Sequence, residues 1–207
     1  MRTYIRRAGL AALMGLWLLT GCLGTSSGFT DDFSDPASGW GAASHETYVR
    51  GYQQGQYLIQ IDVPSWFVWT TAGRTYRDVA VEVVTRSEES TDNNYGVLCR
   101  YQDEDNFYYF AISADGYYAI FRRVEGEELT PLTGQAMLRA SSIHTDGTEN
   151  RVLAVCEEER LTMYVNGEQV AQVQDDALER GDVGMAAGTL AEGSTIVWFD
   201  DLDVRKP

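Results

Sequence analysis

Apolar and polar residues alternate along several short stretches of this chain, with a repeat of two residues. The clearest stretches are residues 57–63, 79–84 and 152–156, which are rich in β-branched residues and bounded by turn residues. A repeat of two is typical of a strand that buries one face, whereas an amphipathic helix repeats its apolar positions about every 3.6 residues. The pattern therefore predicts an all-β domain, with at most one helical turn near residues 177–180.

Two dipeptides mark the strongest predicted hairpin turns, Asp115-Gly116 and Asn166-Gly167. A type I′ turn needs a positive φ at both of its central positions, and Asn, Asp and Gly tolerate that conformation best. We therefore expect a two-residue loop at each dipeptide. A further loop is expected at residues 103–106, where four polar residues separate two apolar runs.

These loops assign the neighbouring side chains to two faces of a sheet. The loop at 115–116 sets Tyr109 opposite Arg122, and the loop at 103–106 sets Arg100 opposite Tyr109. Because strand side chains alternate between faces, each register fixes which residues lie together. One predicted face is apolar and is expected to be core: Val97, Cys99, Tyr101, Phe110, Ile112, Ala119 and Phe121. The other face is aromatic and basic: Arg100, Tyr109, Tyr118 and Arg122.

The aromatic and basic face has two interpretations. It is a ligand-binding surface, or it is an ordinary outer sheet face, where β-propensity favours Tyr and the Arg stem covers apolar area. Trp66 and Trp69 lie nearby in sequence, but their spacing of three places them on opposite faces of a strand.

The two cysteines of the predicted domain, Cys99 and Cys156, are both expected to point into the core. A loop at residues 157–160 sets Cys156 opposite Leu161 and Val152 opposite Val165, and that set is apolar. Outside the cytoplasm such a pair forms a disulfide if the Cα atoms lie within ~7 Å. The alternative is two buried free thiols.

The N-terminus carries an export signal. Arg2, Arg6 and Arg7 precede an apolar run at residues 9–19, which is shorter than the ~20 residues of a membrane-spanning helix. The residues Leu19-Thr20-Gly21-Cys22 close that run and resemble the bacterial lipobox. This resemblance implies cleavage after residue 21 and acylation of Cys22, which anchors the chain in a lipid bilayer. Residues 1–21 are thus the predicted signal peptide, 22–28 the lipidated Cys and tether, and 29–207 one domain.

The predicted mature chain is strongly acidic. Removing residues 1–21 takes away three Arg and no acid, which leaves 13 basic and 31 acidic residues and a net charge of −18. Phosphates would be repelled by this charge, so nucleic acid is excluded as a partner. Neutral sugars, cations and basic proteins remain.

Five motifs follow one another along the predicted domain: Asp31-Asp32-Phe33, Gly39-Trp40, Asn106-Phe107-Tyr108-Tyr109-Phe110, Tyr164-Val165-Asn166-Gly167 and Val197-Trp198-Phe199-Asp200. Their order resembles concanavalin A-like (laminin-G-like) jelly rolls, and in particular the group linked to 3-keto-disaccharide hydrolases, formerly domains of unknown function. The resemblance implies an antiparallel two-sheet sandwich with one concave sheet. Since sugar lies across that concave face in lectins and glucanases of the superfamily, Arg100, Tyr109, Tyr118 and Arg122 are the candidate carbohydrate-binding residues.

The sequence departs from the catalytic pattern of the superfamily, and the resemblance implies one candidate cofactor. Glucanases of the superfamily place carboxylates in a Glu-x-Asp-x-(x)-Glu pattern, whereas Glu82 is isolated in its strand and the other acidic clusters fall in predicted turns. His45 and His144 have no metal-ligand spacing. Calcium is the candidate cofactor, because the superfamily often holds a hard cation with loop carboxylates. Its candidate ligands are Asp31, Asp32 and Asp200, or the loop at residues 103–106.

Three hypotheses follow. The first is a non-catalytic, surface-anchored module that binds carbohydrate on the concave face. The second is an extracytoplasmic glycoside-processing enzyme of the 3-keto-disaccharide hydrolase type. The third is a structural or protein-interaction module of an envelope assembly, with an envelope protein as its partner.

Overall fold

A computed structural model describes residues 27–88, 92–191 and 193–207 of the chain. The predicted signal peptide (residues 1–21) and the predicted lipidation site Cys22 lie outside the described residues, and both stay predictions. Within the described part, no helix is long and apolar enough to cross a membrane.

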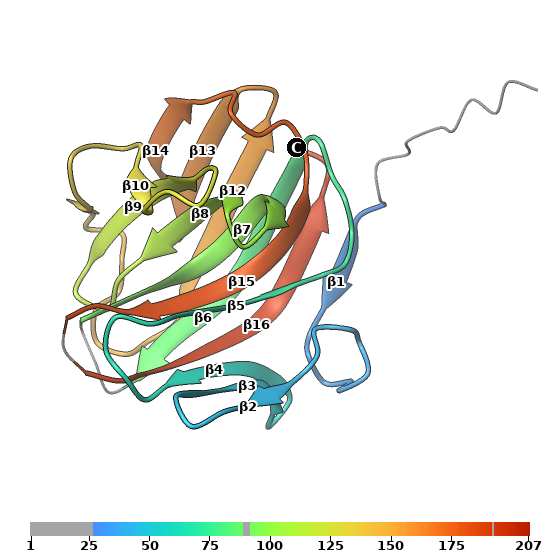
Figure 1. Cartoon of the computed structure of the whole chain (residues 1–207), viewed down its shortest axis with the longest axis vertical. Coiled ribbons are helices and arrows are strands. Elements are labelled where there is room, and N and C mark those ends of the chain that lie inside the picture. The colour runs from blue at the N-terminus through green and yellow to red at the C-terminus, as the bar shows by residue number, and fades with distance from the viewer. Residues whose placement is uncertain (1–26, 89–91, 192) are drawn as a thin grey trace, which may run out of the picture.

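The described chain folds into two antiparallel β-sheets that lie face to face (Figure 1). One sheet has nine strands, ordered β14-β13-β12-β6-β16-β4-β3-β2 with β1 also paired to β16, and the other has seven, ordered β10-β9-β8-β7-β15-β5 with β11 also paired to β9. The strands of the nine-stranded sheet are β1 (Phe29–Asp31), β2 (Ala43–Ser44), β3 (Tyr48–Gln53), β4 (Gln56–Ile61), β6 (Val79–Glu88), β12 (Asn150–Glu157), β13 (Arg160–Val165), β14 (Glu168–Gln174) and β16 (Thr195–Arg205). Those of the seven-stranded sheet are β5 (Phe67–Thr71), β7 (Asn93–Asp103), β8 (Asn106–Ile112), β9 (Tyr117–Arg123), β10 (Thr130–Pro131), β11 (Leu138–Arg139) and β15 (Asp182–Thr189). The predicted all-β sandwich is confirmed.

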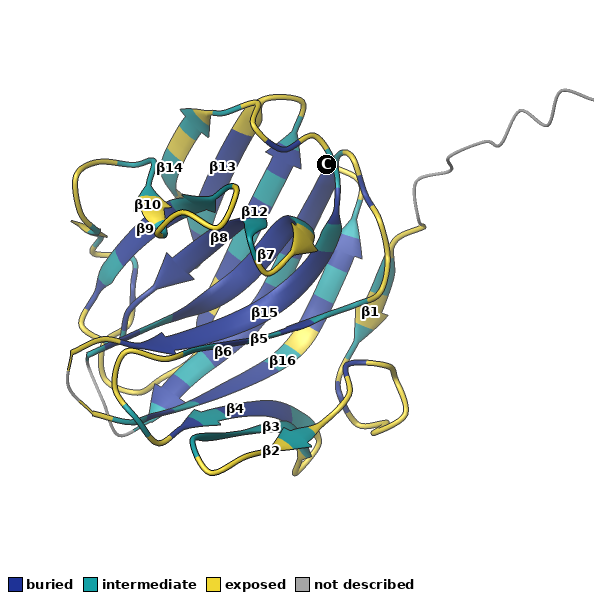
Figure 2. Cartoon of the chain, viewed as in Figure 1, coloured by how far each residue is buried: buried dark blue, intermediate teal, exposed yellow. Residues whose placement is uncertain are grey.

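The main core lies between the sheets, where inward-facing side chains of both meet. Buried residues occur along the central strands of both sheets (Figure 2). Val81 and Val152 from the nine-stranded sheet pack there with Val97 and Phe110 from the seven-stranded sheet, and all four are fully buried. Burial of apolar side chains contributes about 1.5–3 kcal/mol for each Val or Phe, and this layer is the main source of stability.

The hairpins on the C-terminal side have the predicted registers. Cys156 pairs with Leu161 and Val152 with Val165. At the next turn Asn166 and Gly167 both have positive φ, 53° and 83°, as a type I′ turn requires.

The predicted register at Asp115-Gly116 is wrong by one residue. Tyr109 pairs with Phe121 rather than with Arg122. In this turn Gly116 has a positive φ (95°) but Asp115 does not, so the loop is a three-residue turn rather than a type I′ turn. The Ser113 hydroxyl stabilises the longer loop, because it accepts a hydrogen bond from the Tyr117 N–H at 3.1 Å and donates one to Asp115. A slip of one residue moves every side chain of a strand to the opposite face.

A second departure from the predicted pattern is a β-bulge in β7. The β7–β8 register shifts between Cys99 and Asp103, and Arg100 within that stretch has a φ of 52°. The extra residue in a bulge re-aims the side chains on either side of it. Arg100 is therefore buried, while Tyr101 reaches the outer face, the reverse of the prediction.

A disulfide joins the two sheets. Cys99 of β7 is bonded to Cys156 of β12, with 6.9 Å between the Cα atoms, and both side chains are fully buried. The predicted pairing is confirmed. Because disulfides persist in oxidising compartments, the bond places the chain outside the cytoplasm, the location that the predicted export signal implies.

The first and last strands, β1 and β16, also pair (Figure 1). Phe29 of β1 lies opposite Val204 of β16, and Asp31 lies opposite Leu202. The indole N–H of Trp40 donates to the Asp31 carboxylate at 2.8 Å and fixes the turn that follows β1.

Candidate functional site

The outer face of the seven-stranded sheet carries a continuous layer of aromatic side chains, here called the aromatic face. Its residues come from β5, β7, β8 and β9 and form a hydrophobic cluster separate from the main core. The members are Phe67, Trp69, Tyr101, Phe107, Tyr109 and Phe121. Phe107 and Tyr109 are buried within the layer, and the other four are half-buried. An aromatic layer on the outside of a sandwich has no second sheet to pack against.

Small residues on the central strands form the floor of this layer. One row of paired residues runs from Trp69 through Ala186 and Gly96 to Ala111. Ala and Gly leave room above the sheet for the rings of neighbouring rows. Gly188 leaves space for the ring of Phe67, since a Cβ at this position would lie only 3.3 Å from a ring carbon.

Four of the rings surround a common centre. Phe67 lies 5.8 Å from Trp69 and 5.9 Å from Phe107, measured between ring centroids. Tyr101 closes the group, at 5.9 Å from Phe107 and 6.3 Å from Trp69. The Phe67 and Phe107 planes differ by 3°. Offset-parallel rings at these distances attract one another, so the group holds its own geometry.

Hydrogen bonds fix the polar atoms of the face. The Trp69 indole N–H donates to the Tyr101 hydroxyl at 3.0 Å, and the Tyr109 hydroxyl donates to the Asn94 side-chain oxygen at 3.0 Å. Burial raises the pKa of Tyr101 and of Tyr109 above the ordinary value. Both phenols are therefore neutral at physiological pH.

The four residues predicted to bind carbohydrate do not share this face. Tyr109 alone belongs to it. Arg100 is 2 % exposed, and its guanidinium donates to the carbonyl oxygens of Leu178 (2.8 Å), Arg77 (3.3 Å) and Glu158. It ties three loops together at one end of the sandwich.

Tyr118 and Arg122 lie on the inner side of their strand, as the one-residue slip requires. Tyr118 is buried in the main core. The Arg122 guanidinium pairs with the Asp175 carboxylate at 2.6 Å, and Asp175 also accepts a hydrogen bond from the Tyr108 hydroxyl. The predicted grouping of Arg100, Tyr109, Tyr118 and Arg122 on one face is therefore corrected.

Sequence reasoning missed Phe67, Trp69, Tyr101 and Phe107 as a group. Two signals pointed to them. Phe67 and Trp69 alternate in the strand register, which places both on one face. The strand β15 contains Ala186, Ala187 and Gly188, and such small residues leave space for large neighbours.

A cavity of about 330 Å³ lies at the free edge of β5 and is here called the edge cavity. Trp66, which is 44 % exposed, lines it together with the side chains of β3 and β5. The complete lining is Tyr48, Arg50, Trp66, Phe67, Val68 and Trp69.

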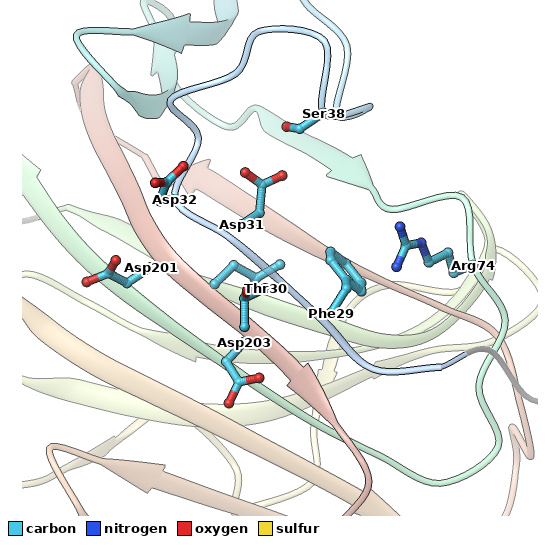
Figure 3. Close-up of a pocket in the computed structure, with 9 residues that line it drawn as sticks. Phe29, Thr30, Asp31, Asp32, Ser38, Arg74, Asp201 and Asp203 are labelled. Atoms are coloured by element: carbon cyan, nitrogen blue, oxygen red, sulfur yellow. The ribbon is translucent and has the colours of Figure 1, made fainter.

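A second, acidic cleft of about 550 Å³ lies beside the paired ends of the chain (Figure 3). Its carboxylates, including those of Asp31, Asp32, Asp201 and Asp203, point in different directions rather than toward one centre (Figure 3).

The calcium ligands predicted from the sequence do not fit a calcium site as a set. Asp31 accepts hydrogen bonds from the Phe33 N–H and from Trp40, and Asp200 accepts them from Gln56 and the Asp201 N–H. Among the described residues, no three or more His, Cys, Asp or Glu side chains group in a way that holds a metal ion.

No model of a protein family and no curated protein matches the chain. Solved structures do share its architecture. A β-glucanase from Bacillus licheniformis superposes with a TM-score of 0.64 at 10 % identity, over 89 % of this chain and 100 % of that one. The carbohydrate-binding module CBM66 from Bacillus subtilis superposes with a TM-score of 0.56 at 13 % identity, over 86 % and 94 %. A protein of unknown function with a galectin-like fold, also from Bacillus subtilis, gives 0.65 at 10 %, over 88 % and 97 %. The chain thus has the fold that its sequence motifs predicted, the concanavalin A-like jelly-roll sandwich.

Proposed function

We propose that this chain is a non-catalytic carbohydrate-binding module, and that it binds sugar on the aromatic face. The observation that carries the proposal is the continuous layer of rings on the outside of the seven-stranded sheet. Partly exposed aromatic rings gathered on one outer face mark an interaction site in a protein that is otherwise strongly acidic. The similarity of the fold to a carbohydrate-binding module and a β-glucanase supports the same class of ligand.

The chemistry of the face suits a pyranose ring. The C–H groups of a pyranose present an apolar surface that packs flat on an aromatic ring, and its hydroxyls bond polar groups at the margin. Trp69 and Tyr101 are half-buried and held by their mutual hydrogen bond, so little rotamer entropy is lost when a ligand binds. The neutral phenol of Tyr101 both donates and accepts hydrogen bonds.

We favour binding over hydrolysis because the rings that carry the proposal supply apolar contact area and neither an acid nor a base. A retaining glycosidase needs two carboxyl groups about 5–5.5 Å apart at the scissile bond. Glu82, in the other sheet, is held by Arg151 and Arg205, each at 2.9 Å. Its oxygens are already engaged in structural ion pairs.

The proposed location is outside the cytoplasm, with the chain tethered to a membrane through an acylated Cys22. The lipobox-like residues before Cys22 support the anchor. More than one acyl chain on a single Cys gives firm attachment, which a single chain does not.

The test is a glycan-array screen of residues 23–207, with and without calcium, followed by calorimetry on the hits. The double variant Trp69→Ala/Tyr101→Ala is expected to abolish binding. Tyr164→Ala is the matched control, because Tyr164 is a half-buried aromatic residue of β13, in the other sheet. Equal loss in both variants would contradict the assignment of the site. Silence across the array would favour an envelope-protein partner.

A further inference from the structure

The edge cavity adjoins the aromatic face. Phe67 and Trp69 belong to the aromatic cluster and also line the cavity. A chain-like ligand lying on the aromatic face therefore reaches the cavity as it crosses the edge strand β5. The volume of about 330 Å³ is within the range of small-molecule sites, which begins at about 300 Å³.

Trp66 gives the cavity an exposed aromatic wall. Its side chain is one of the few large apolar groups on the described surface, at 44 % exposure. Its backbone is fixed against β15, since the Trp66 N–H donates to the Thr189 hydroxyl at 3.1 Å and the Thr189 N–H donates to the Trp66 carbonyl at 2.9 Å. The ring thus stands on a rigid support.

Arg50 gives the cavity a positive charge. One guanidinium nitrogen, Nη1, donates to the Trp40 carbonyl at 3.1 Å and to the Tyr57 hydroxyl at 2.9 Å. These contacts hold the guanidinium in place. Among the described residues no carboxylate lies within ion-pair distance of Arg50, although acidic residues outnumber basic ones about two to one in this chain. The Nε and Nη2 donors have no protein acceptor in that part of the chain.

We propose that the edge cavity binds a carboxylate-bearing sugar unit, such as a uronic acid, at the end of a glycan that lies on the aromatic face. Arg50 pairs with the carboxylate, and Trp66 stacks on the ring. This inference rests on the proposed carbohydrate-binding function. A half-buried guanidinium with unused donors prefers a planar carboxylate to a hydroxyl, because charge-assisted hydrogen bonds are about twice as strong as neutral ones. Acidic residues elsewhere in the chain repel the carboxylate of the sugar only weakly, since salt screens charges beyond about 8 Å at physiological ionic strength.

The test compares a galacturonic acid tetrasaccharide with its carboxyl-reduced counterpart by calorimetry on residues 23–207. The wild type is expected to bind the acidic tetrasaccharide at least about tenfold more tightly, which corresponds to about 1.4 kcal/mol. Arg50→Gln is expected to remove that preference, and Arg50→Lys to retain part of it. Trp66→Ala is expected to weaken binding of both tetrasaccharides.

Arg74→Gln is the matched control. Arg74 also lacks a carboxylate partner among the described residues, but its guanidinium lies 3.9 Å over the ring of Phe29, away from the edge cavity. Thermal melts show whether Arg50→Gln is folded, and Trp66→Ala tests the cavity without touching the contacts of Arg50. Equal wild-type affinity for the two tetrasaccharides, with binding still lost in Trp69→Ala/Tyr101→Ala, would overturn this inference and leave the proposed function standing. Binding of neither tetrasaccharide by the wild type would overturn this inference, and the glycan array would then decide the proposed function.

Discussion

The indole N–H of Trp69 donates a hydrogen bond to the hydroxyl of Tyr101 at 3.0 Å, and this bond joins the edge strand β5 to β7 across the intervening strand β15. It sets the orientation of two half-buried rings of the aromatic face. Tyr101→Phe keeps the ring but removes the acceptor, so the Trp69 ring is free to turn. We expect a loss of glycan affinity of about three- to tenfold by calorimetry, with a change in Tm below about 2 °C, because a partly exposed hydrogen bond contributes about 1 kcal/mol. Tyr164→Phe is the control, and an unchanged affinity in Tyr101→Phe would show that the bond does not position the site.

Arg100 is expected to matter for stability and not for binding. Arg100→Met leaves the carbonyls of Leu178, Arg77 and Glu158 without their buried donor. We expect a loss of about 3 kcal/mol in unfolding free energy, measured by urea denaturation, since each unsatisfied buried polar group costs about 1–3 kcal/mol. Glycan affinity, measured at a temperature at which the variant is folded, is expected to be unchanged. Loss of binding in a fully folded Arg100→Met variant would restore Arg100 to the site.

Replacing the disulfide is expected to destabilise the sandwich. The bond closes a loop with a sequence separation of 57 residues, and it connects the two sheets. Loop-closure entropy and typical measurements place the loss for Cys99→Ser/Cys156→Ser at about 2–4 kcal/mol in unfolding free energy. Wild-type protein melted in a reducing agent is expected to approach the Tm of the double variant. Coincident melts of oxidised and reduced wild type would contradict this.

The ion pairs of Glu82 predict a stability difference that depends on pH. Burial raises the pKa of Glu82, but the hydrogen bonds from Arg205 and Arg151 outweigh it and leave the pKa below the ordinary value of 4.5. A carboxyl group whose pKa is lower in the folded state stabilises the fold above its unfolded pKa, and this stability is lost as the pH falls through the folded pKa.

Glu82→Gln is therefore expected to lower Tm by about 2–4 °C at pH 7, which corresponds to about 1 kcal/mol for a domain of this size. The gap between wild type and variant is expected to close as the pH falls below 4.5. Thermal melts from pH 7 to pH 3 measure it. A gap that stays constant across this range would show that the charge of Glu82 contributes nothing.

Calcium is expected to leave the Tm unchanged within about 1 °C, because no three acidic side chains in the described part of the chain are arranged to hold a metal ion and so to couple its binding to stability. Asp31 and Asp200 would have to give up the hydrogen bonds that they accept from Trp40 and Gln56. Melts with calcium and with a chelator test this. A rise of several degrees with calcium that is lost in Asp31→Asn would establish the ligand set predicted from the sequence.

Local turn chemistry explains which registers the sequence predicts correctly. Asn166-Gly167 favours one turn geometry, the type I′ turn. That turn determines the register of β13 and β14 next to it, and the register determines the apolar face that includes Val165. The inward direction of Cys99 and Cys156 also follows, because it needs only the parity of two strands, and the bulge lies beyond Cys99. The distance of 6.9 Å between their Cα atoms, which permits the disulfide, comes from the packing of the two sheets.

The candidate site depends on two features that the local sequence does not determine. Asp115-Gly116 is compatible with both a two-residue and a three-residue loop, and the Ser113 hydroxyl favours the longer one. The left-handed conformation of Arg100 depends on distant carbonyls that bind its guanidinium. Tertiary contacts decide both. The two errors together exchanged the predicted positions of Arg100 and Tyr101 and placed Arg122 on the outer face, whereas its side chain lies on the inner side.

The bond between Cys99 and Cys156 has a mechanical consequence. Cys156 belongs to the sheet that contains β1, where the predicted tether begins, and Cys99 belongs to the sheet that carries the aromatic face. A pulling force between the tether and a ligand held on that face acts to separate the two layers of the sandwich. The apolar layers between them resist such a force only through many weak contacts, whereas the disulfide transmits it through a covalent bond. The disulfide would thus carry the mechanical load between the proposed anchor and the proposed ligand site.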